Sequence, residues 1–305
     1  MKTIACWLLG LWWLAFAAPA RAADPCPQLR TQFDAADVAT RIAAIACQEN
    51  HAWFRPFIDA DGHAGTTAVY EAENSPLADG GQAWRRVAAY WNGSDLASDC
   101  SRQPACRNFV IDTPWSAAFV SWVMRRAGLA GFRSSASHVD YVRAAWRQPL
   151  HGPYRLESPQ IARPAPGDLL CYVRGSDWVI GPGGLSDHMQ RGSLPMHCDI
   201  VVAATPGELA YLVGGNVQQA VTLRMLRLDA AGRFADLPQR SASDSPCSPD
   251  APARCNANRQ DWVALLKLRA TTPAPTSGSP SLLATSERPP PALSTPVPSH
   301  REDTP

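Results

Sequence analysis

The chain has 305 residues, of which 46% are hydrophobic, and its formal net charge is +1. A chain this close to neutral offers no polybasic surface, which argues against nucleic acid or anionic lipid as its partner. Its length is sufficient for one substantial hydrophobic core.

The first 22 residues predict a secretory signal peptide. A basic start precedes an apolar run over residues 4–16, and small residues at Ala20 and Ala22 form an A-x-A cleavage site. The apolar run is too short to span a bilayer. We therefore expect an exported protein, periplasmic or secreted, whose mature chain begins at Ala23 or Asp24 and contains no membrane span.

The cysteine count agrees with an oxidising compartment. Nine cysteines become eight once Cys6 leaves with the signal peptide, and an even number favours disulfides. Cys171 and Cys198 lie in apolar, strand-like runs, where they either pair across neighbouring strands or remain buried thiols. The other six predict three local pairs: Cys26 with Cys47, Cys100 with Cys106, and Cys247 with Cys255.

The first half of the mature chain is predicted to be helical. In the helix that follows Pro114, Thr113 is the expected N-cap, Pro114 the first helical residue and Gly128 the end. Ser137 is the expected cap of a later helix. Apolar residues recur at helical spacing in four segments: 35–49, 82–91, 114–127 and 137–146.

The second half changes to strand patterns. A Gly-rich loop over residues 174–195 separates the first strand from the others and could form a lid. The remaining connections are short, which predicts an antiparallel meander and an α+β fold. The expected strands lie within residues 164–173, 196–204, 208–216 and 220–228.

The chain is predicted to form one domain followed by a tail. Residues 271–305 are rich in Pro, Ser and Thr and have few large apolar side chains. Such a segment cannot bury enough surface to offset its ordering entropy, so we expect it to be disordered. Residues 24–270 form the single α+β domain.

The motifs of this domain resemble a known family. The stretches "TPWSAAFVSWVMRRAG", "SHVDY", "PAPGDLLCY", "HCDIVV" and "LVGGN" are similar to the bacterial domain of unknown function 2272. Their order also resembles that of the papain-like cell-wall hydrolases, the NlpC-type peptidases and CHAP amidases. The resemblance covers residues 42–228. It implies a helix packed on a small antiparallel sheet, with the site where the helix N-terminus meets the sheet.

The same resemblance points to a catalytic site of Ser116, His197 and Asn216. Ser116 lies in the first turn of a helix, where the macrodipole favours developing negative charge, and is expected to expose its hydroxyl. His197 begins a strand and would take the proton, while Asn216 ends the next strand and would orient the imidazole. The superfamily's usual nucleophile is Cys, so Ser116 is a departure that must rely on general-base assistance.

Four further residues are candidates for contacting substrate: Trp115, His138, Tyr141 and Asp199. His138 and Tyr141 share a helix face at i and i+3. Asp199 lies beside His197 at i+2, a spacing that hardly allows a linear bond to its ring. We see no metal-ligand spacing, and the sequence predicts neither a metal nor another cofactor.

Two classes of function remain open from the sequence. The first is an exported amide or ester hydrolase, with peptidoglycan peptides as the substrate that the resemblance implies. The second is a non-catalytic domain that keeps the papain-like fold and binds envelope peptide or glycan. A secreted effector enzyme is a third, weaker alternative. Each of Ser116, His197 and Asn216 also has an ordinary structural explanation as a helix-turn, strand or turn residue.

Overall fold

A computed structural model of the protein describes residues 23–70, 76–96, 100, 105–175, 179, 181–189, 194–240, 248 and 255–269. The predicted signal peptide and the predicted tail at 271–305 both lie outside these residues. Within the described parts of the chain, every helix falls short of the length and apolarity needed to cross a bilayer.

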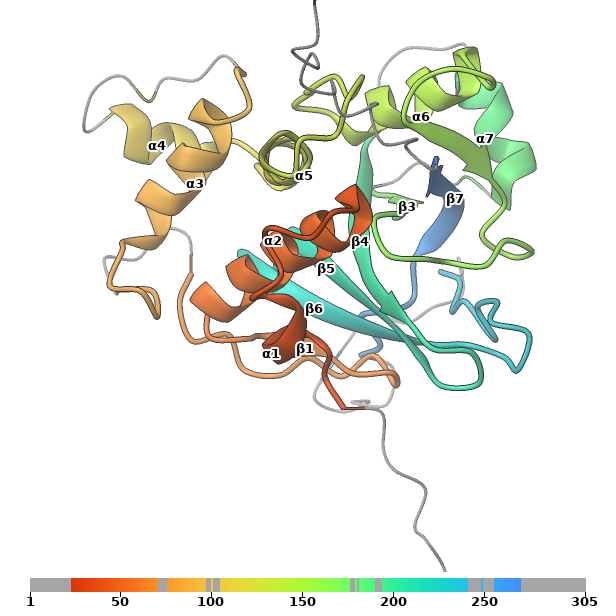
Figure 1. Ribbon diagram of the computed structural model, residues 1–305, viewed down its shortest axis with the longest axis horizontal. Coiled ribbons are helices and arrows are strands. Elements are labelled where there is room, and N and C mark those ends of the chain that lie inside the picture. The colour runs from red at the N-terminus through yellow and green to blue at the C-terminus, as the bar shows by residue number, and fades with distance from the viewer. Residues whose placement is uncertain are drawn as a thin grey trace, which may run out of the picture. The chain divides into compact units, whose positions relative to one another are not determined.

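Most of the helices precede most of the strands, except for one early strand at residues 57–58 and one late helix at residues 181–189 (Figure 1). The helices are α1 (Cys26–Leu29), α2 (Val38–Ala52), α3 (Ala83–Asn92), α4 (Ala105–Asp112), α5 (Ser116–Arg126), α6 (His138–Arg147) and α7 (Gly181–Met189). The strands are β1 (Phe57–Ile58), β2 (Tyr154–Glu157), β3 (Leu169–Val173), β4 (Met196–Ala204), β5 (Leu209–Val217), β6 (Ala220–Arg227) and β7 (Asp261–Leu268).

The strands form one mixed sheet of seven strands in the order β1-β6-β5-β4-β3-β7-β2. The predicted meander from β3 to β6 is present as four antiparallel neighbours. Strand β1 pairs in parallel with β6, and β7 enters between β3 and β2 from the far end of the chain. The α+β class is confirmed, and the strands β1, β2 and β7 are additions that the sequence did not predict.

Each face of the sheet is covered by a separate core. Helices α2 and α5 pack over β4, β5 and β6 on one face (Figure 1). Strand alternation then assigns neighbouring residues to opposite faces. Cys171 and Cys198 belong to the core beneath the helices. Leu170 and Tyr172 belong to the second core, together with Trp262 of β7.

Helix α5 begins at Ser116, two residues later than predicted. Trp115 occupies the N-cap position at φ −105° and ψ 5°, without a side-chain cap, so Thr113 and Pro114 precede the helix. Trp115 is fully buried because its ring stacks on Trp53 at 5.7 Å and lies 5.6 Å from Tyr90. The burial of this aromatic side chain, in place of a polar cap, fixes where the helix starts.

Cys171 and Cys198 form a disulfide, which is one of the two alternatives that the sequence left open. These two residues are directly paired neighbours on β3 and β4, and their sulfurs are bonded. Cys26 is bonded to Cys47, and Cys100 to Cys106, as predicted. Cys255 is also in a disulfide, but its predicted partner Cys247 lies outside the described residues. The bonded cysteines are compatible with an exported protein.

The predicted loop over residues 174–195 contains helix α7, which packs against β7.

The contacts of Asp168 show the structural role of the "PAPGDLLCY" motif. Its carboxylate accepts hydrogen bonds from the backbone N–H of Ala165 at 2.7 Å and of Leu268 at 2.8 Å, and it pairs with Lys267. The motif therefore attaches the start of β3 to the end of β7.

Candidate functional site

Ser116 and His138 form the contact on which the candidate site is built. Ser116 is the first residue of α5 and His138 the first residue of α6. The Ser116 Oγ and the His138 Nε2 lie 2.8 Å apart. Both side chains are almost fully buried, with exposed fractions of 4% and 3%. The hydroxyl is therefore not the exposed group that the sequence predicted.

The surroundings of His138 keep its imidazole neutral. Burial lowers the pKa of His138 well below its usual value, and the charge of nearby His197 acts in the same direction. Its position at the N-terminus of α6 also disfavours a positive charge. If the neutral ring carries its proton on Nδ1, which is buried without a hydrogen-bond partner among the described residues, the Nε2 lone pair can accept the hydroxyl proton of Ser116. A general base requires this tautomer.

His197 is bound to Asp199 and not to Ser116. The His197 Nε2 lies 2.7 Å from the Asp199 Oδ1, and both side chains are 1% exposed. The sequence prediction that this i+2 spacing hardly permits such a bond was wrong. The predicted pairing of His197 with Ser116 is not present among the described residues; the ring of His138 stands in that place, 5.1 Å from the ring of His197.

Strand alternation explains this arrangement. His197 and Asp199 lie on the face of β4 that carries Tyr172 of the neighbouring strand, whereas Cys198 faces the core beneath α5. The rings of His197 and Tyr172 are 5.1 Å apart. Among the described contacts, His197 is linked to Ser116 through the ring of His138.

Arg224 of β6 completes a buried ionic network with Asp199. The Arg224 Nε donates to the Asp199 Oδ2 at 2.8 Å, and its Nη1 donates to the backbone oxygen of Ala257 and to the Oδ1 of Asn258. Burial would raise the pKa of Asp199, but Arg224 and His197 outweigh it and hold this pKa well below its usual range. The carboxylate therefore stays ionised and fixes the His197 ring through a charge-assisted bond.

Tyr172 is the aromatic neighbour of this network. Burial raises the pKa of the Tyr172 hydroxyl to about 12. The Arg224 guanidinium lies 5.9 Å from the Tyr172 ring and 5.7 Å from the Trp262 ring. Aromatic faces at this distance attract a cation, which adds to the fixation of Arg224.

Two glycines before Asn216 make room for the site. A Cβ on Gly214 would lie 1.9 Å from the Asp199 Oδ1, and a Cβ on Gly215 would lie 2.6 Å from the Cβ of Phe119. Strand β5 can therefore approach the carboxylate on one face and helix α5 on the other only with glycine at both positions. The "GGN" motif is explained by this close packing.

Asn216 has a backbone φ of 56° and lies at a bulge in the pairing of β5 with β6. It is half-buried. In the described part of the chain its side chain forms no hydrogen bond to Ser116, His138 or His197. A left-handed turn residue before the tight hairpin at 217–220 is the structural interpretation that the sequence also allowed.

The two aromatic candidates support the site from within the core. Trp115 packs among Trp53 and Tyr90, as described above. Tyr141 is 5% exposed, and its hydroxyl contacts the backbone oxygens of Ala117 and Ser135 at 2.8 Å each. Its ring meets that of His138 edge-on at 5.8 Å. Tyr141 therefore ties the start of α6 to the first turn of α5.

Arg224 is the residue that the sequence analysis missed. It occurs in the strand "AVTLRMLRL", where its neighbours at i−1 and i+2 are buried and apolar. An Arg on an inward position of such a strand requires a buried anion. That requirement, combined with Asp199 two strands away, was the available signal.

Replacing Arg224 by leucine is expected to lower the free energy of unfolding by about 3–5 kcal/mol, because Asp199 would remain buried without its counter-ion. Arg227 on the same strand provides a matched control. It pairs with Asp61 at 2.8 Å with both side chains exposed, so Arg227→Leu should cost no more than about 1 kcal/mol. Urea denaturation measures both variants, and equal losses would contradict the assigned role of Arg224.

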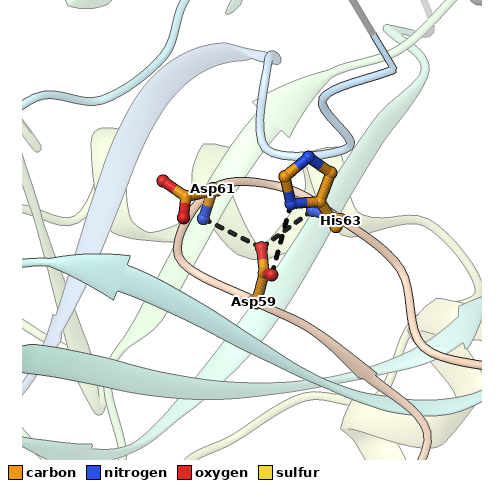
Figure 2. A group of neighbouring side chains, drawn as sticks. All are labelled: Asp59, Asp61 and His63. Carbon is orange, nitrogen blue, oxygen red and sulfur yellow. Dashed lines mark hydrogen bonds and ion pairs between the residues drawn. The ribbon is translucent and has the colours of Figure 1, made fainter. Parts of the chain in front are cut away.

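A second cluster lies in the loop after β1. Figure 2 shows the Asp59 carboxylate turned toward the backbone N–H of Asp61 and toward His63. Possible ligand atoms of these three residues lie within 4.8 Å of one another. Asp59 accepts from both backbone N–H groups at 2.9 Å, however, and Asp61 pairs with Arg227. These contacts account for the cluster as a loop structure.

The comparisons with known proteins give one match. The family model described as "Uncharacterized protein conserved in bacteria (DUF2272)" matches residues 78–268, more than half of the chain. This range contains every member of the candidate site from Ser116 to Arg224. No curated protein and no solved structure matches the chain.

Proposed function

We propose that this chain, which belongs to the DUF2272 family, is an exported serine hydrolase of amide or ester bonds. One observation carries the proposal: the Ser116 Oγ lies 2.8 Å from the Nε2 of a buried histidine, at the N-terminus of a helix. A hydroxyl nucleophile requires such a base because it is not ionised on its own at neutral pH.

The proposed reaction uses His138 as the base. The Ser116 Oγ attacks the carbonyl carbon while its proton moves to the His138 Nε2. The oxyanion that forms can accept hydrogen bonds from N–H groups in the first turn of α5, which have no acceptor within the helix. The leaving amine or alcohol then takes the proton from His138. A water molecule then attacks the acyl carbon while its proton moves to the His138 Nε2, and the Ser116 Oγ takes that proton back as the acyl group leaves.

His197 has a positioning role in this proposal. Asp199 and Arg224 fix its ring, and that ring packs beside His138. An immobile neighbour restricts the orientation of the His138 imidazole and so keeps its Nε2 directed at Ser116. The positive charge that His138 gains during attack is also within reach of the ionised Asp199 carboxylate.

The resemblance to the papain-like NlpC-type and CHAP hydrolases supports envelope peptides, and peptidoglycan peptides in particular, as the substrate. The similarity rests on the order of the Ser116 helix, the His197 strand and the "GGN" strand. The amino-terminal signal-like segment and the disulfides support action outside the cytoplasm. The hydrolysed bond would then be an amide.

A specific observation favours a second candidate, a non-catalytic domain that binds envelope peptide or glycan. Ser116 and His138 are only 4% and 3% exposed, so a substrate must displace neighbouring groups to reach the hydroxyl. A buried Ser–His pair can also serve packing alone. The two candidates differ in whether Ser116 can be acylated.

The proposal is tested with a fluorophosphonate probe and with muropeptides. Wild-type protein is expected to take up the probe at Ser116, as located by peptide mass spectrometry, and to cleave muropeptides of at least one cell-wall chemotype. Protein already blocked by the probe serves as the matched control, because its fold and composition are otherwise unchanged. Absence of labelling, together with product profiles equal to those of muropeptides incubated without protein, would favour the binding domain.

A further inference from the structure

A cavity of about 420 Å³ lies beside α6, and its lining includes neither Ser116 nor His138. It is bounded by the segment before α6, by the helix itself and by the start of β2. Phe132, Tyr141 and Tyr154 supply an aromatic lining. A volume of this size is typical of small-molecule sites, which combine apolar walls with a few polar groups.

The charged groups around this cavity are mostly cationic. Arg133, Arg143 and Arg147 line it, against a single acid, Asp140. The Asp140 carboxylate is already engaged, since its Oδ2 accepts from the Ser135 Oγ at 2.7 Å and its Oδ1 lies 3.6 Å from Arg143. Neither Arg133 nor Arg147 forms an ion pair with any residue that the structure describes. The cavity therefore has an excess of positive charge.

The walls are fixed before any ligand arrives. The Tyr154 hydroxyl donates to the backbone oxygen of Gly167 at 2.9 Å, and the Tyr141 hydroxyl is held by the backbone of α5 as described.

We infer that this cavity binds a small molecule that carries a carboxylate on an aromatic or alkyl body. The guanidinium groups match a carboxylate in shape and charge, because each presents paired N–H donors in one plane. The aromatic lining takes the apolar body. The inference needs only binding, so it holds whether or not Ser116 is a nucleophile.

The test compares two probes of equal shape, 3-phenylpropionate and its neutral amide, titrated into the mature chain and followed by NMR or calorimetry. The carboxylate is expected to bind saturably at millimolar concentrations or below, and the amide at least about tenfold more weakly, since a charge-assisted bond is worth more than 1.4 kcal/mol. The double variant Arg133→Gln/Arg147→Gln should weaken carboxylate binding by a similar factor. Both side chains are exposed, so the fold should be unaffected.

The double variant Arg85→Gln/Arg126→Gln is the matched control, because it removes the same charge from exposed positions on α3 and α5 outside the cavity. It should leave the affinity unchanged. Equal binding of the acid and the amide, an equal loss in the control, or no saturable binding of the carboxylate would each overturn the inference.

Discussion

Replacing Ser116 by alanine is expected to abolish fluorophosphonate labelling and all hydrolysis, because the change removes the only atom proposed to become acylated. It should also lower the free energy of unfolding by about 1–3 kcal/mol, since the buried His138 Nε2 loses its partner. An exposed hydroxyl, which the sequence led us to expect, would have given almost no loss of stability. Labelling yield and urea denaturation measure the two effects separately.

Ser121 supplies the matched control for this variant. It is another buried serine of α5, and its Oγ lies 2.7 Å from the Tyr141 hydroxyl and 3.1 Å from the Ser135 oxygen. Ser121→Ala should cost similar stability but retain labelling. Ser116→Cys should give a reactive thiol, because the helix N-terminus favours the thiolate. Labelling that survives in Ser116→Ala would remove Ser116 from the mechanism.

Replacing His138 by alanine is expected to slow labelling by about 10²–10⁴-fold, the usual contribution of a general base. His197→Ala should have a smaller effect, since His197 acts only by positioning His138. The sequence, which assigned the base to His197, suggested the opposite ranking of these two effects. The labelling rates of the two variants, each normalised to its folded fraction, decide whether His138 or His197 is the base.

The pH profile gives an independent measure of the same assignment. A base is active when it is unprotonated, and burial lowers the pKa of His138 well below its ordinary value of about 6.5. The labelling rate should therefore stay on its plateau as the pH falls through 6.5 and decline only at lower pH. A decline centred at or above the ordinary histidine value would contradict His138 as the base.

The regular elements of the domain could be predicted because each has a local signal. Helix α2, helix α6 and the strands from β3 to β6 have apolar periodicity with clear ends, and they were found within a few residues of their predicted bounds. The family was also indicated by its motifs and is confirmed by the match over residues 78–268. The papain-like relationship remains a prediction.

The candidate site was only partly predictable, because its contacts depend on side-chain direction across several elements. The sequence placed Ser116 at a helix start and His197 at a strand start, but it could not show that His138 stands between them. The face on which His197 lies follows from the pairing of Cys198 with Cys171, which was one of two open alternatives. Arg224 was hidden for the same reason, since its partner Asp199 is distant in sequence.

The position of β7 determines when the protein can finish folding. This strand is made last of all the described elements, yet it lies between β3 and β2, and it is the strand that pairs with β2. Until Leu268 has emerged, β3 presents an unpaired edge that other chains can add to, which is a known route to aggregation. Contacts such as Tyr154 with Leu268 also close a long stretch of chain, and such pairings slow folding. The chain is therefore expected to be most prone to association before its final strand is available.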